Sequence, residues 1–423
     1  MCGIVGIIDL QEKRAIDTSL LTRMNRSQLH RGPDEGGLHV EPGVGLGHQR
    51  LSIIDLLGGQ QPMFNEDRSV VIAFNGEIYN FRLLMTELKR FGHNFRTHSD
   101  TEVIVHAWEQ WGERCVERLR GMFAFGLWDR KRQCLFLARD RLGVKPLFYA
   151  HTNDGYLIFG SELKALMCHP GLTRELSPSA IEDYFAYGYV PEPRTIFQQA
   201  YKLAPGHTLL QTGAALARPK QYWDIPFTPH PAMCEEQACD ELIARLRQAV
   251  EIRLVAEVPL GAFLSGGVDS SAIVALMAGL RNEPLNTCSI SFGDPRFDET
   301  HHAATVAQRY HTIHHSLQVG QNDFSLIDQL STLYDEPFAD SSALPTYRVC
   351  QLARQHVTVA LSGDGGDENL AGYRRYRWHL YEERLRSRLP LALRRPIFGF
   401  LGQVYPKADW APRALRAKTT FEA

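Results

Sequence analysis

A glycine-rich turn that follows an apolar run is the stretch of this sequence best suited to hold a phosphate. The apolar residues 258–264 lead into Ser265-Gly266-Gly267, and a helical pattern covers 272–279. The order predicts a strand, a turn and a helix whose first N–H groups converge on one point, where a phosphate or pyrophosphate binds well. Asp269 adds a carboxylate that suits a bridging divalent metal. No Gly-Lys-Ser/Thr occurs in the chain, so the turn is not a Walker P-loop.

The second residue is a cysteine that could act as nucleophile and base together. Removal of Met1 would leave the Cys2 thiol beside a free α-amine, whose pKa of roughly 7.7–8 makes it a partial base near neutral pH. N-terminal threonine hydrolases use the same arrangement. Taken alone, a buried cysteine at a chain terminus is the simpler interpretation. The motifs that follow in this half favour the nucleophile, so we expect the mature protein to begin at Cys2.

Length and composition restrict the function class. A chain of 423 residues predicts two or three domains. The apolar content of 44% and the charged content of 22% are typical of a soluble globular protein. The net charge of −2 gives no electrostatic reason to expect nucleic acid or an anionic membrane as a partner. No apolar run approaches a membrane span, and the first residues do not form a signal peptide. Eight cysteines without a CxxC pair indicate a reduced, cytoplasmic protein.

Strands and helices that could position these residues are predicted along both halves of the chain. Periodicity predicts strands at 4–9, 45–54, 69–74, 134–139, 145–150 and 156–160, and helices at 80–91 and 101–111. Proline and glycine become dense between 187 and 227, which places a domain boundary near residue 210. We therefore expect one domain over 2–210 and a second over 211–423.

The second half reads as a parallel, doubly wound sheet. A helix over 238–255 with an apolar stripe comes first, then strands at 286–292, 313–319 and 356–362 alternate with helices at 299–310, 323–334 and 346–355. Ligands are expected at the carboxyl ends of such strands, where the second glycine turn, 362–368, also lies. Residues 335–342 are expected to face the same crevice. Three histidines near a strand (His311, His314 and His315) favour a structural role over a metal site.

Five motifs of the N-terminal half resemble the class II glutamine amidotransferases. They are CGIVG at 2–6, HRGPD at 30–34, GHQRLSIID at 47–55, FNGEIYN at 74–80 and SDTE at 99–102. The resemblance implies a layered α/β sandwich of the N-terminal-nucleophile type, with Cys2 as nucleophile. It also implies glutamine contacts from Arg50, Leu51, Ile53, Ile54, Asn75, Gly76, Glu77 and Asp100.

The polar and charged contacts that the resemblance implies have physical reasons. The Asn75 amide and the Gly76 N–H would form an oxyanion hole for the charge that develops on an amide carbonyl. The Arg50 guanidinium suits the glutamine α-carboxylate. Asp100, with Glu77, would face the α-ammonium. A surface ion pair is the usual alternative for one charged residue, but it is a poor explanation for all of these positions together. Arg31 is expected to order the loop over the thiol.

The first glycine turn resembles the SGGxDS loop of the ATP pyrophosphatases, which cleave ATP between its α and β phosphates. The resemblance implies nucleotide contacts from Leu264, Ser265, Gly266, Gly267, Asp269, Ser270, Ile290, Ser362 and Gly363. It also implies that Asp269 and Asp367 share Mg²⁺ on the pyrophosphate.

Both halves together resemble glutamine-hydrolysing asparagine synthetase. That family releases ammonia at the cysteine site and passes it through an internal tunnel. At the second site, ammonia displaces AMP from an adenylated carboxylate, which is aspartate in the type member. The division into two connected sites has a chemical reason. A carboxylate has no leaving group until it is activated, and free ammonia would be protonated in water. Expected partners are glutamine, ATP and a carboxylate acceptor; a homodimer is left open.

Two departures from that family bear on the acceptor. Asp364 stands where the family usually carries a glutamate that is thought to assist ammonia attack, so we include Asp364 among the catalytic candidates. With the stretch ENLAGYRRYRWH at 368–379, it is closer to an amidotransferase branch associated with exosortase and exopolysaccharide systems. The sequence ends at KTTFEA, 418–423, before the family's usual end and before a lysine of its synthetase site, which suggests a fragment.

Rival functions make different demands on the sequence. A pure N-terminal-cysteine hydrolase would not need the turn at 265–269. A catalytically inactive ATP-binding assembly protein would not need Cys2, Asn75 and Asp100 together. An enzyme that activates RNA for thiolation should show a basic surface and metal or thiol pairs, which this composition lacks.

Overall fold

The computed structural model describes residues 1–9, 13–213, 217–227, 233–292, 298–320, 326–388 and 390–406. Two features of the sequence, the KTTFEA tail and the first residues of the helix expected from 323, lie outside the described residues. Among the described residues, no helix has both the length and the apolar character that a membrane span requires.

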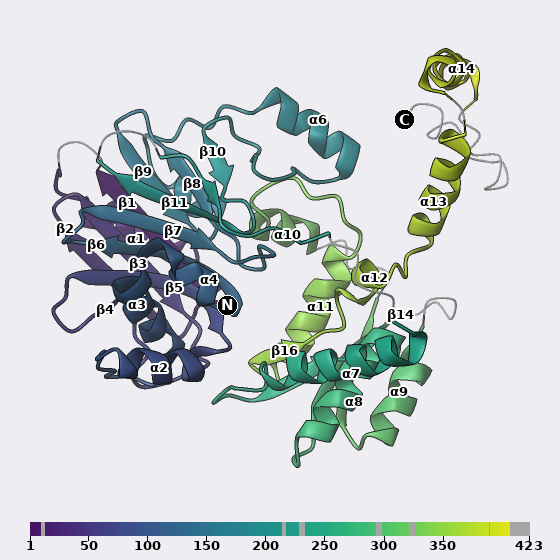
Figure 1. Cartoon of the computed structure of the whole chain (residues 1–423), viewed down its shortest axis with the longest axis horizontal. Helices are drawn as coiled ribbons and strands as arrows, with labels where there is room; N and C mark the ends of the chain where they lie inside the picture. The colour runs from purple at the N-terminus through teal and green to yellow at the C-terminus, as the bar shows by residue number, and fades with distance from the viewer. Residues whose placement is uncertain are drawn as a thin grey trace.

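Residues 3–221 form two six-stranded sheets with helices on their outer faces (Figure 1). The first sheet has the order β10-β8-β9-β1-β3-β2 and the second the order β12-β11-β7-β6-β5-β4. Their strands are β1 Gly3–Asp9, β2 Glu35–Glu41, β3 Val44–Arg50, β4 Met63–Phe64, β5 Val70–Ile78, β6 Gly121–Asp129, β7 Cys134–Arg139, β8 Phe148–His151, β9 Tyr156–Gly160, β10 Ala200–Lys202, β11 His207–Thr212 and β12 Lys220–Gln221. The helices are α1 Thr18–Arg26, α2 Phe81–Arg90, α3 Asp100–Trp111, the 3₁₀ turn η1 Gly112–Arg114, α4 Cys115–Arg118, α5 Leu163–Met167 and α6 Pro178–Tyr187.

The interface between the sheets is apolar and closely packed. Strand β1 is buried throughout, and its residues Ile4 and Ile8 pack against Val71 and Leu135 of the facing sheet. Helices α2 and α3 cover the outer face of the second sheet, and α1 and α5 cover that of the first. The predicted layered α/β sandwich is confirmed.

The sheet arrangement continues past the expected boundary at residue 210. Strand β11 runs through this position and pairs with β7, and β12 adds to the same sheet. Several expected strands also have different bounds; β5, for example, runs to Ile78 instead of ending at residue 74. Strand β3 ends at Arg50, because the carbonyls of the following loop bond the Arg50 side chain instead of a neighbouring strand. Strand β8 begins only at Phe148.

Residues 235–361 contain the parallel sheet, in the order β15-β14-β13-β16. Its strands are β13 Leu260–Phe263, β14 Asn286–Phe292, β15 Ile313–Val319 and β16 Val359–Leu361. The helices are α7 Glu235–Glu251, α8 Val268–Leu280, α9 Thr300–Arg309, α10 Ile327–Leu333, α11 Ala343–Arg354, α12 Gly366–Asn369, α13 Arg374–Arg386 and α14 Leu391–Val404. The predicted parallel sheet is present, and α13 and α14 extend away from it (Figure 1).

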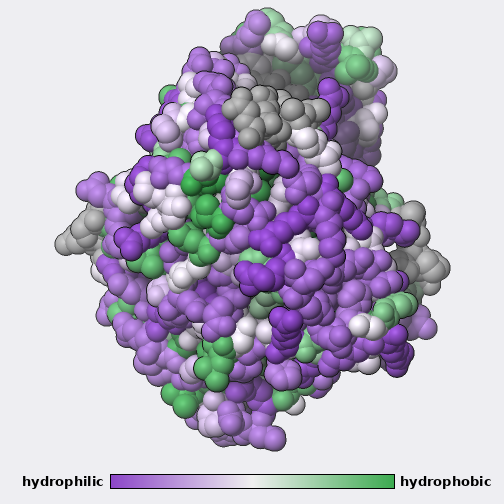
Figure 2. Space-filling view, turned by 90° about the vertical axis from the view of Figure 1, so that its left-hand side faces the viewer, coloured by the Kyte–Doolittle hydropathy of each residue, from purple (hydrophilic) through white to green (hydrophobic). Residues whose placement is uncertain are grey.

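The apolar stripe expected on α7 is only partly buried. Val250 is in the core, but Ala238 and Leu242 are exposed, because only the C-terminal turns of α7 pack on the sheet domain. On the face shown in Figure 2, hydrophobic residues are scattered in small groups among hydrophilic ones. Such scattering is normal for the surface of a globular protein.

Candidate functional site

Strand pairing places Cys2 beside the turn after β3. Strand β1 pairs with β3 so that Gly3 is opposite Gln49, and Cys2 therefore lies next to Arg50 and Leu51. The Leu51 N–H donates to the Cys2 Sγ at 3.4 Å, and Arg31 Nε donates to the Cys2 carbonyl at 2.9 Å. Burial raises the pKa of the Cys2 thiol, so the thiol needs a nearby base before it can attack.

The N-terminal amine is in the same buried region. Burial lowers the pKa of the Met1 α-amine to about 5, so this amine is a neutral base at pH 7. Lys145, which sequence reasoning missed, also faces this region: burial lowers its pKa to about 8, and its Nζ lies 2.9 Å from the Met1 Sδ. A single lysine in a turn carries no periodic signal that could have identified it.

Asn75 and Gly76 lie near the end of β5 in a site that excludes water. Asn75 is 1% exposed, and neither its amide nitrogen nor its amide oxygen has a hydrogen-bond partner among the described residues. A buried amide without partners is rare in folded proteins, and it is typical of a site that awaits a ligand. A Cβ at Gly76 would lie 2.2 Å from the Met122 carbonyl of the neighbouring strand, so only glycine fits there.

Arg50 holds the loop that follows it. Its guanidinium is buried and donates to the carbonyls of Ile54, Asp55 and Leu56 at 2.7–3.3 Å, and to Glu35 Oε2 at 3.2 Å. In this structure, Arg50 therefore orders the loop 51–57.

The same loop is held from its other side by Glu257, just before β13. The Glu257 carboxylate accepts hydrogen bonds from the N–H groups of Asp55 at 3.1 Å and Leu56 at 3.3 Å. The backbone N–H of Glu257 donates to the Ile53 carbonyl at 3.0 Å. The loop beside Cys2 and the strand that leads to the first glycine turn are thus joined directly. Sequence reasoning missed Glu257, because a lone loop glutamate carries no pattern.

Two carboxyls near β5 and α3 have raised pKa values. Asp100 Oδ2 accepts the Ile78 N–H at 2.9 Å, and burial raises the pKa of Asp100 to about 6. Burial, followed by repulsion from Asp100, raises the pKa of Glu77 to about 7. A cationic group bound between these carboxyls would favour their ionised forms.

The two glycine turns of the parallel sheet lie against each other. The first follows β13, and Gly266 adopts φ +90°, where a Cβ would lie 2.6 Å from the Ala303 nitrogen. Ser265 Oγ and Ser270 Oγ are 3.0 Å apart and close the turn. A Cβ at Gly363, in the turn after the adjacent strand β16, would lie 2.6 Å from the Ser270 nitrogen. Strands β13 and β16 therefore deliver both turns to one edge, as the topology predicts.

Asp269 lies at this edge, against the turn that carries Asp367. A Cβ at Gly366 would lie 2.3 Å from the Asp269 Oδ2, so the Asp269 carboxylate abuts the residue before Asp367. Two carboxylates are the hard oxygen donors that Mg²⁺ prefers, so the donor set fits this ion. Asp364 is exposed and accepts from the Ser362 hydroxyl at 2.9 Å. Leu264 is buried, and Ile290 is half-buried on the neighbouring strand β14.

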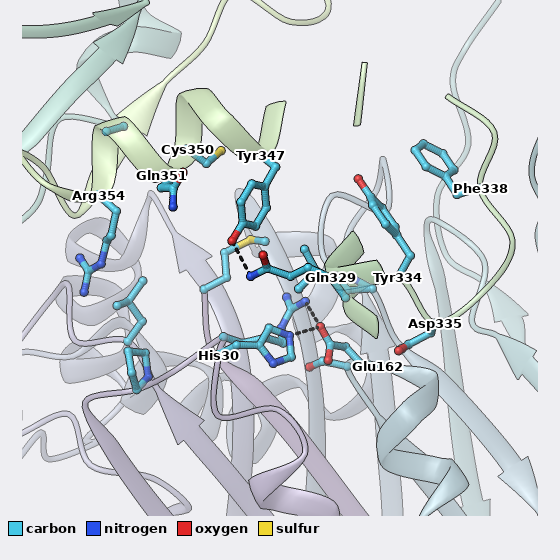
Figure 3. A pocket seen from close by; sticks show the side chains of 18 of the residues that line it. His30, Glu162, Gln329, Tyr334, Asp335, Phe338, Tyr347, Cys350, Gln351 and Arg354 are labelled. Carbon is cyan, nitrogen blue, oxygen red and sulfur yellow. Dashed lines mark hydrogen bonds and ion pairs between the residues drawn. The ribbon is translucent and has the colours of Figure 1, made fainter. Parts of the chain in front are cut away.

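A cavity of about 1420 Å³ lies between the two sheet systems (Figure 3). At one end it is lined by Met1, Arg31 and Leu51, around the thiol. At the other end it is lined by Phe263 and Ala360, which belong to the strands that end in the two glycine turns. The cavity therefore extends from the surroundings of Cys2 to the strands that lead into the two glycine turns, and it is partly open to solvent.

Charged side chains close one wall of this cavity. His30 Nε2 and Arg31 Nη1 contact Glu162 Oε1 at 3.0 and 3.1 Å (Figure 3). Lys164 Nζ lies 3.6 Å from Glu162 Oε2 and 3.3 Å from Asp335 Oδ1. Arg31 is thus anchored close to the thiol, in line with its expected role. Sequence reasoning missed Glu162 and Lys164.

The segment from Asp335 lines the cavity, and residues of the first sheet system hold it in place. Glu336 pairs with Lys202 at 2.6 Å and accepts the Ile196 N–H at 2.6 Å, while the Ala339 N–H donates to the Gly188 carbonyl at 2.8 Å. The segment docks on the first sheet system because its carboxylates find lysines there. The histidines near β15 are structural as predicted: His314 contacts two hydroxyls, and the ring of His315 stacks on His356 at 3.5 Å.

Comparison with known proteins assigns both parts of the chain. Residues 1–223 match the model of a glutamine amidotransferase domain, and residues 241–423 match the model of asparagine synthase. The chain is 39% identical over 398 residues to a putative glutamine-hydrolysing asparagine synthetase 2 of Methanocaldococcus jannaschii, covering 88% of this chain and 76% of the relative. It is 35% identical over 429 residues to asparagine synthetase 1 of Bacillus subtilis, covering 100% of this chain and 65% of the relative.

A second Bacillus subtilis enzyme, asparagine synthetase 3, is 36% identical over 403 residues, covering 88% of this chain and 63% of the relative. The chain thus spans between 63% and 76% of the length of these three relatives. Both domain matches and all three relatives agree, and the chain belongs to the family of the glutamine-hydrolysing asparagine synthetases.

Proposed function

We propose that this protein is an ATP-dependent, glutamine-hydrolysing amidotransferase that makes asparagine from aspartate. The observation that carries the proposal is the single cavity that joins the surroundings of Cys2 to the strands that bear the two glycine turns. Ammonia released into this cavity has a path to the second site that is less exposed to bulk water than a route over the protein surface. A separate glutaminase or a separate ATPase would have no use for a shared cavity.

At the first site, Cys2 is the nucleophile. Once Met1 is removed, the α-amine of Cys2 takes the thiol proton, and the thiolate attacks the amide carbon of glutamine. The Asn75 amide and the Gly76 N–H stabilise the oxyanion, and the burial of Asn75 strengthens its hydrogen bond. Ammonia leaves, and water hydrolyses the thioester to glutamate. The Leu51 to Ile54 stretch forms the wall of the glutamine pocket, while Glu77 and Asp100 receive the α-ammonium.

At the second site, an acceptor carboxylate oxygen attacks the α-phosphorus of ATP and diphosphate leaves. The N–H groups of the first glycine turn and the start of α8 receive the phosphates, and Leu264 and Ile290 flank the adenine. Asp269 and Asp367 would hold Mg²⁺, which supplies positive charge to the diphosphate. Ammonia then attacks the acyl carbon and AMP leaves, with Asp364 placed to assist that attack.

Two substitutions should separate the two half-reactions. In the full-length protein, Cys2→Ala should reduce glutamine hydrolysis by about 10³-fold or more, because the nucleophile is lost, and should spare synthesis from added ammonia. Asp269→Asn should stop formation of AMP and diphosphate but leave glutaminase activity intact, because it keeps the shape and removes the charge. Glutamate release and diphosphate release measure the two sites. A Cys2→Ala protein that still hydrolyses glutamine would refute the assignment of the nucleophile.

Glutamine affinity should depend on pH through Asp100 and Glu77. Their raised pKa values of about 6 and about 7 mean that both lose negative charge as the pH falls from 8 to 5. A glutamine α-ammonium keeps its charge over this range, so its attraction to the pocket weakens. The KM for glutamine should rise about tenfold or more, because at pH 5 the protonated form of a carboxyl of pKa 6 exceeds the ionised form about tenfold. A KM that is constant across this range, measured by glutamate release, would remove both carboxyls from the pocket.

Glu257→Ala should weaken communication between the sites. Loss of its carboxylate frees the Asp55 and Leu56 N–H groups, so two of the three hydrogen bonds between residue 257 and the loop beside Cys2 are lost. We expect a severalfold rise in the KM for glutamine and more glutamine hydrolysed per AMP formed, with ammonia-dependent synthesis unchanged. Glu251→Ala, an exposed residue at the C-terminal end of α7, is the matched control. Equal behaviour of the two variants would show that Glu257 does not couple the sites.

A different acceptor is the second candidate function, and Asp364 is the observation that favours it. The shorter aspartate leaves more room than the family's glutamate, which suits a bulkier sugar or polymer carboxylate of a surface polysaccharide. If aspartate is the acceptor, Asp364→Glu should be tolerated or help. If the acceptor is bulky, Glu should slow turnover by roughly 10²-fold, as a 1 Å misplacement does.

Diphosphate release by the full-length protein distinguishes the two acceptors. We expect stimulation by aspartate, with asparagine as product. Stimulation by an extracted exopolysaccharide precursor, and none by aspartate, would establish the alternative. No stimulation by any carboxylate would favour an inactive ATP-binding assembly protein.

A further inference from the structure

Three side chains outside both candidate sites converge on one point beside α3. His106 and Glu109 lie one turn apart on this helix, and His93 lies in the connection that precedes it. Each offers one ligand atom, and the three atoms all lie within 4.8 Å of one another. Two imidazoles and a carboxylate form the donor set of open zinc sites in metalloenzymes.

The outer atoms of His93 and Glu109 have hydrogen-bond partners, and the outer atom of His106 faces a carboxylate beyond hydrogen-bond distance. His93 Nε2 contacts the Gln110 Oε1 at 3.1 Å, and His106 Nε2 points toward the Glu102 carboxylate at 3.7 Å. The Asn65 amide donates to Glu109 Oε1 at 2.7 Å. Metal-binding histidines almost always donate their far N–H to such an acceptor, which fixes the tautomer and turns the near nitrogen toward the metal.

The inner atoms then face one another. Glu109 Oε2 lies 2.8 Å from His106 Nδ1 and 3.6 Å from His93 Nδ1. If His93 donates through Nε2, its Nδ1 presents a lone pair to a carboxylate oxygen. Two lone pairs at this separation repel, and a cation between them removes the repulsion.

We propose that His93, His106 and Glu109 bind a divalent transition-metal ion, for which zinc is the best match. Imidazole and carboxylate donors suit zinc, and three protein ligands leave one position for water. The His93 and Glu109 side chains are partly exposed, so an ion can enter from solvent, whereas His106 is buried.

Such an ion would fasten the connection between α2 and α3 to the helix. That connection also contains His98, whose N–H donates to Asp55 Oδ2 at 2.8 Å, and it ends at the start of α3, which Asp100 begins. Metal binding would therefore stiffen the segment that leads into the glutamine pocket. The role is structural and is separate from the proposed chemistry.

A proton on His106 is the competing occupant. Burial on its own lowers the pKa of His106, but hydrogen bonds with Glu102 and Glu109 outweigh it and raise the pKa to about 9. An incoming metal ion must therefore displace a proton.

The test uses the full-length protein, stripped with a chelator and titrated with Zn²⁺ alone. We expect one zinc per chain at these residues and a rise in Tm on loading, because only the folded protein presents the site. His93→Ala and Glu109→Gln should each weaken the zinc Kd at least tenfold. His39→Ala is the matched control, because His39 makes a similar contact with Glu41 at 3.2 Å but has no third ligand.

The absorption spectrum of bound Co²⁺ distinguishes this site from a cysteine site. This measurement does not require a substituted protein. Co²⁺ bound by two histidines and a glutamate should show visible d–d absorption without a thiolate charge-transfer band. Zinc bound as tightly by His93→Ala and Glu109→Gln as by the wild type, a cobalt spectrum with thiolate character, or no zinc binding with no change in Tm would each overturn the proposal.

Discussion

The ion pairs between residues 162–202 and residues 335–336 hold the two sheet systems around one cavity. Lys164 joins Glu162 to Asp335, and Lys202 pairs with Glu336. All of these side chains are largely buried, so their charges interact in a medium that screens them less than water does. Removing one partner would leave a buried charge without compensation, which commonly costs 3–5 kcal/mol. The contact therefore fixes the register of the two parts as well as their proximity.

The geometry of both candidate sites follows from that register. On one side, Glu162 anchors Arg31, and Arg31 holds the backbone of Cys2. On the other side, the segment from Asp335 leads into α11, whose residues line the cavity. The chain then continues through β16 to the second glycine turn. Glu257 adds a second connection, from the loop beside Cys2 to the start of β13. The two parts are thus connected through two separate sets of contacts.

Much of the fold could be predicted from the sequence wherever periodicity is strong. Strands β7, β14 and β15 coincide with their predicted bounds, since β7 is a short apolar run and β14 and β15 largely alternate apolar and polar residues. The two glycine turns were also identified, because glycine is required where backbones approach as closely as Gly363 approaches Ser270. Strand β6 was missed, because an apolar run buried on both faces does not alternate.

The contacts between the two parts could not be predicted. Glu162, Glu257 and Asp335 act through partners more than a hundred residues away, and a single charged loop residue gives no local signal of such a partner. Asp335 and Glu336 line the cavity, but the lysines that they contact could not be predicted for this reason. The unpartnered amide of Asn75 likewise became visible only when its burial was known.

The central claim is that ammonia passes from Cys2 to the second site without entering water. The most direct measurement supplies the full-length protein with amide-¹⁵N glutamine, ATP and aspartate in the presence of excess unlabelled ammonium, and determines the label in the asparagine amide. Transfer through the cavity predicts that nearly all of the amide nitrogen carries ¹⁵N whatever the ammonium concentration. A label that falls in proportion to the added ammonium would contradict the account.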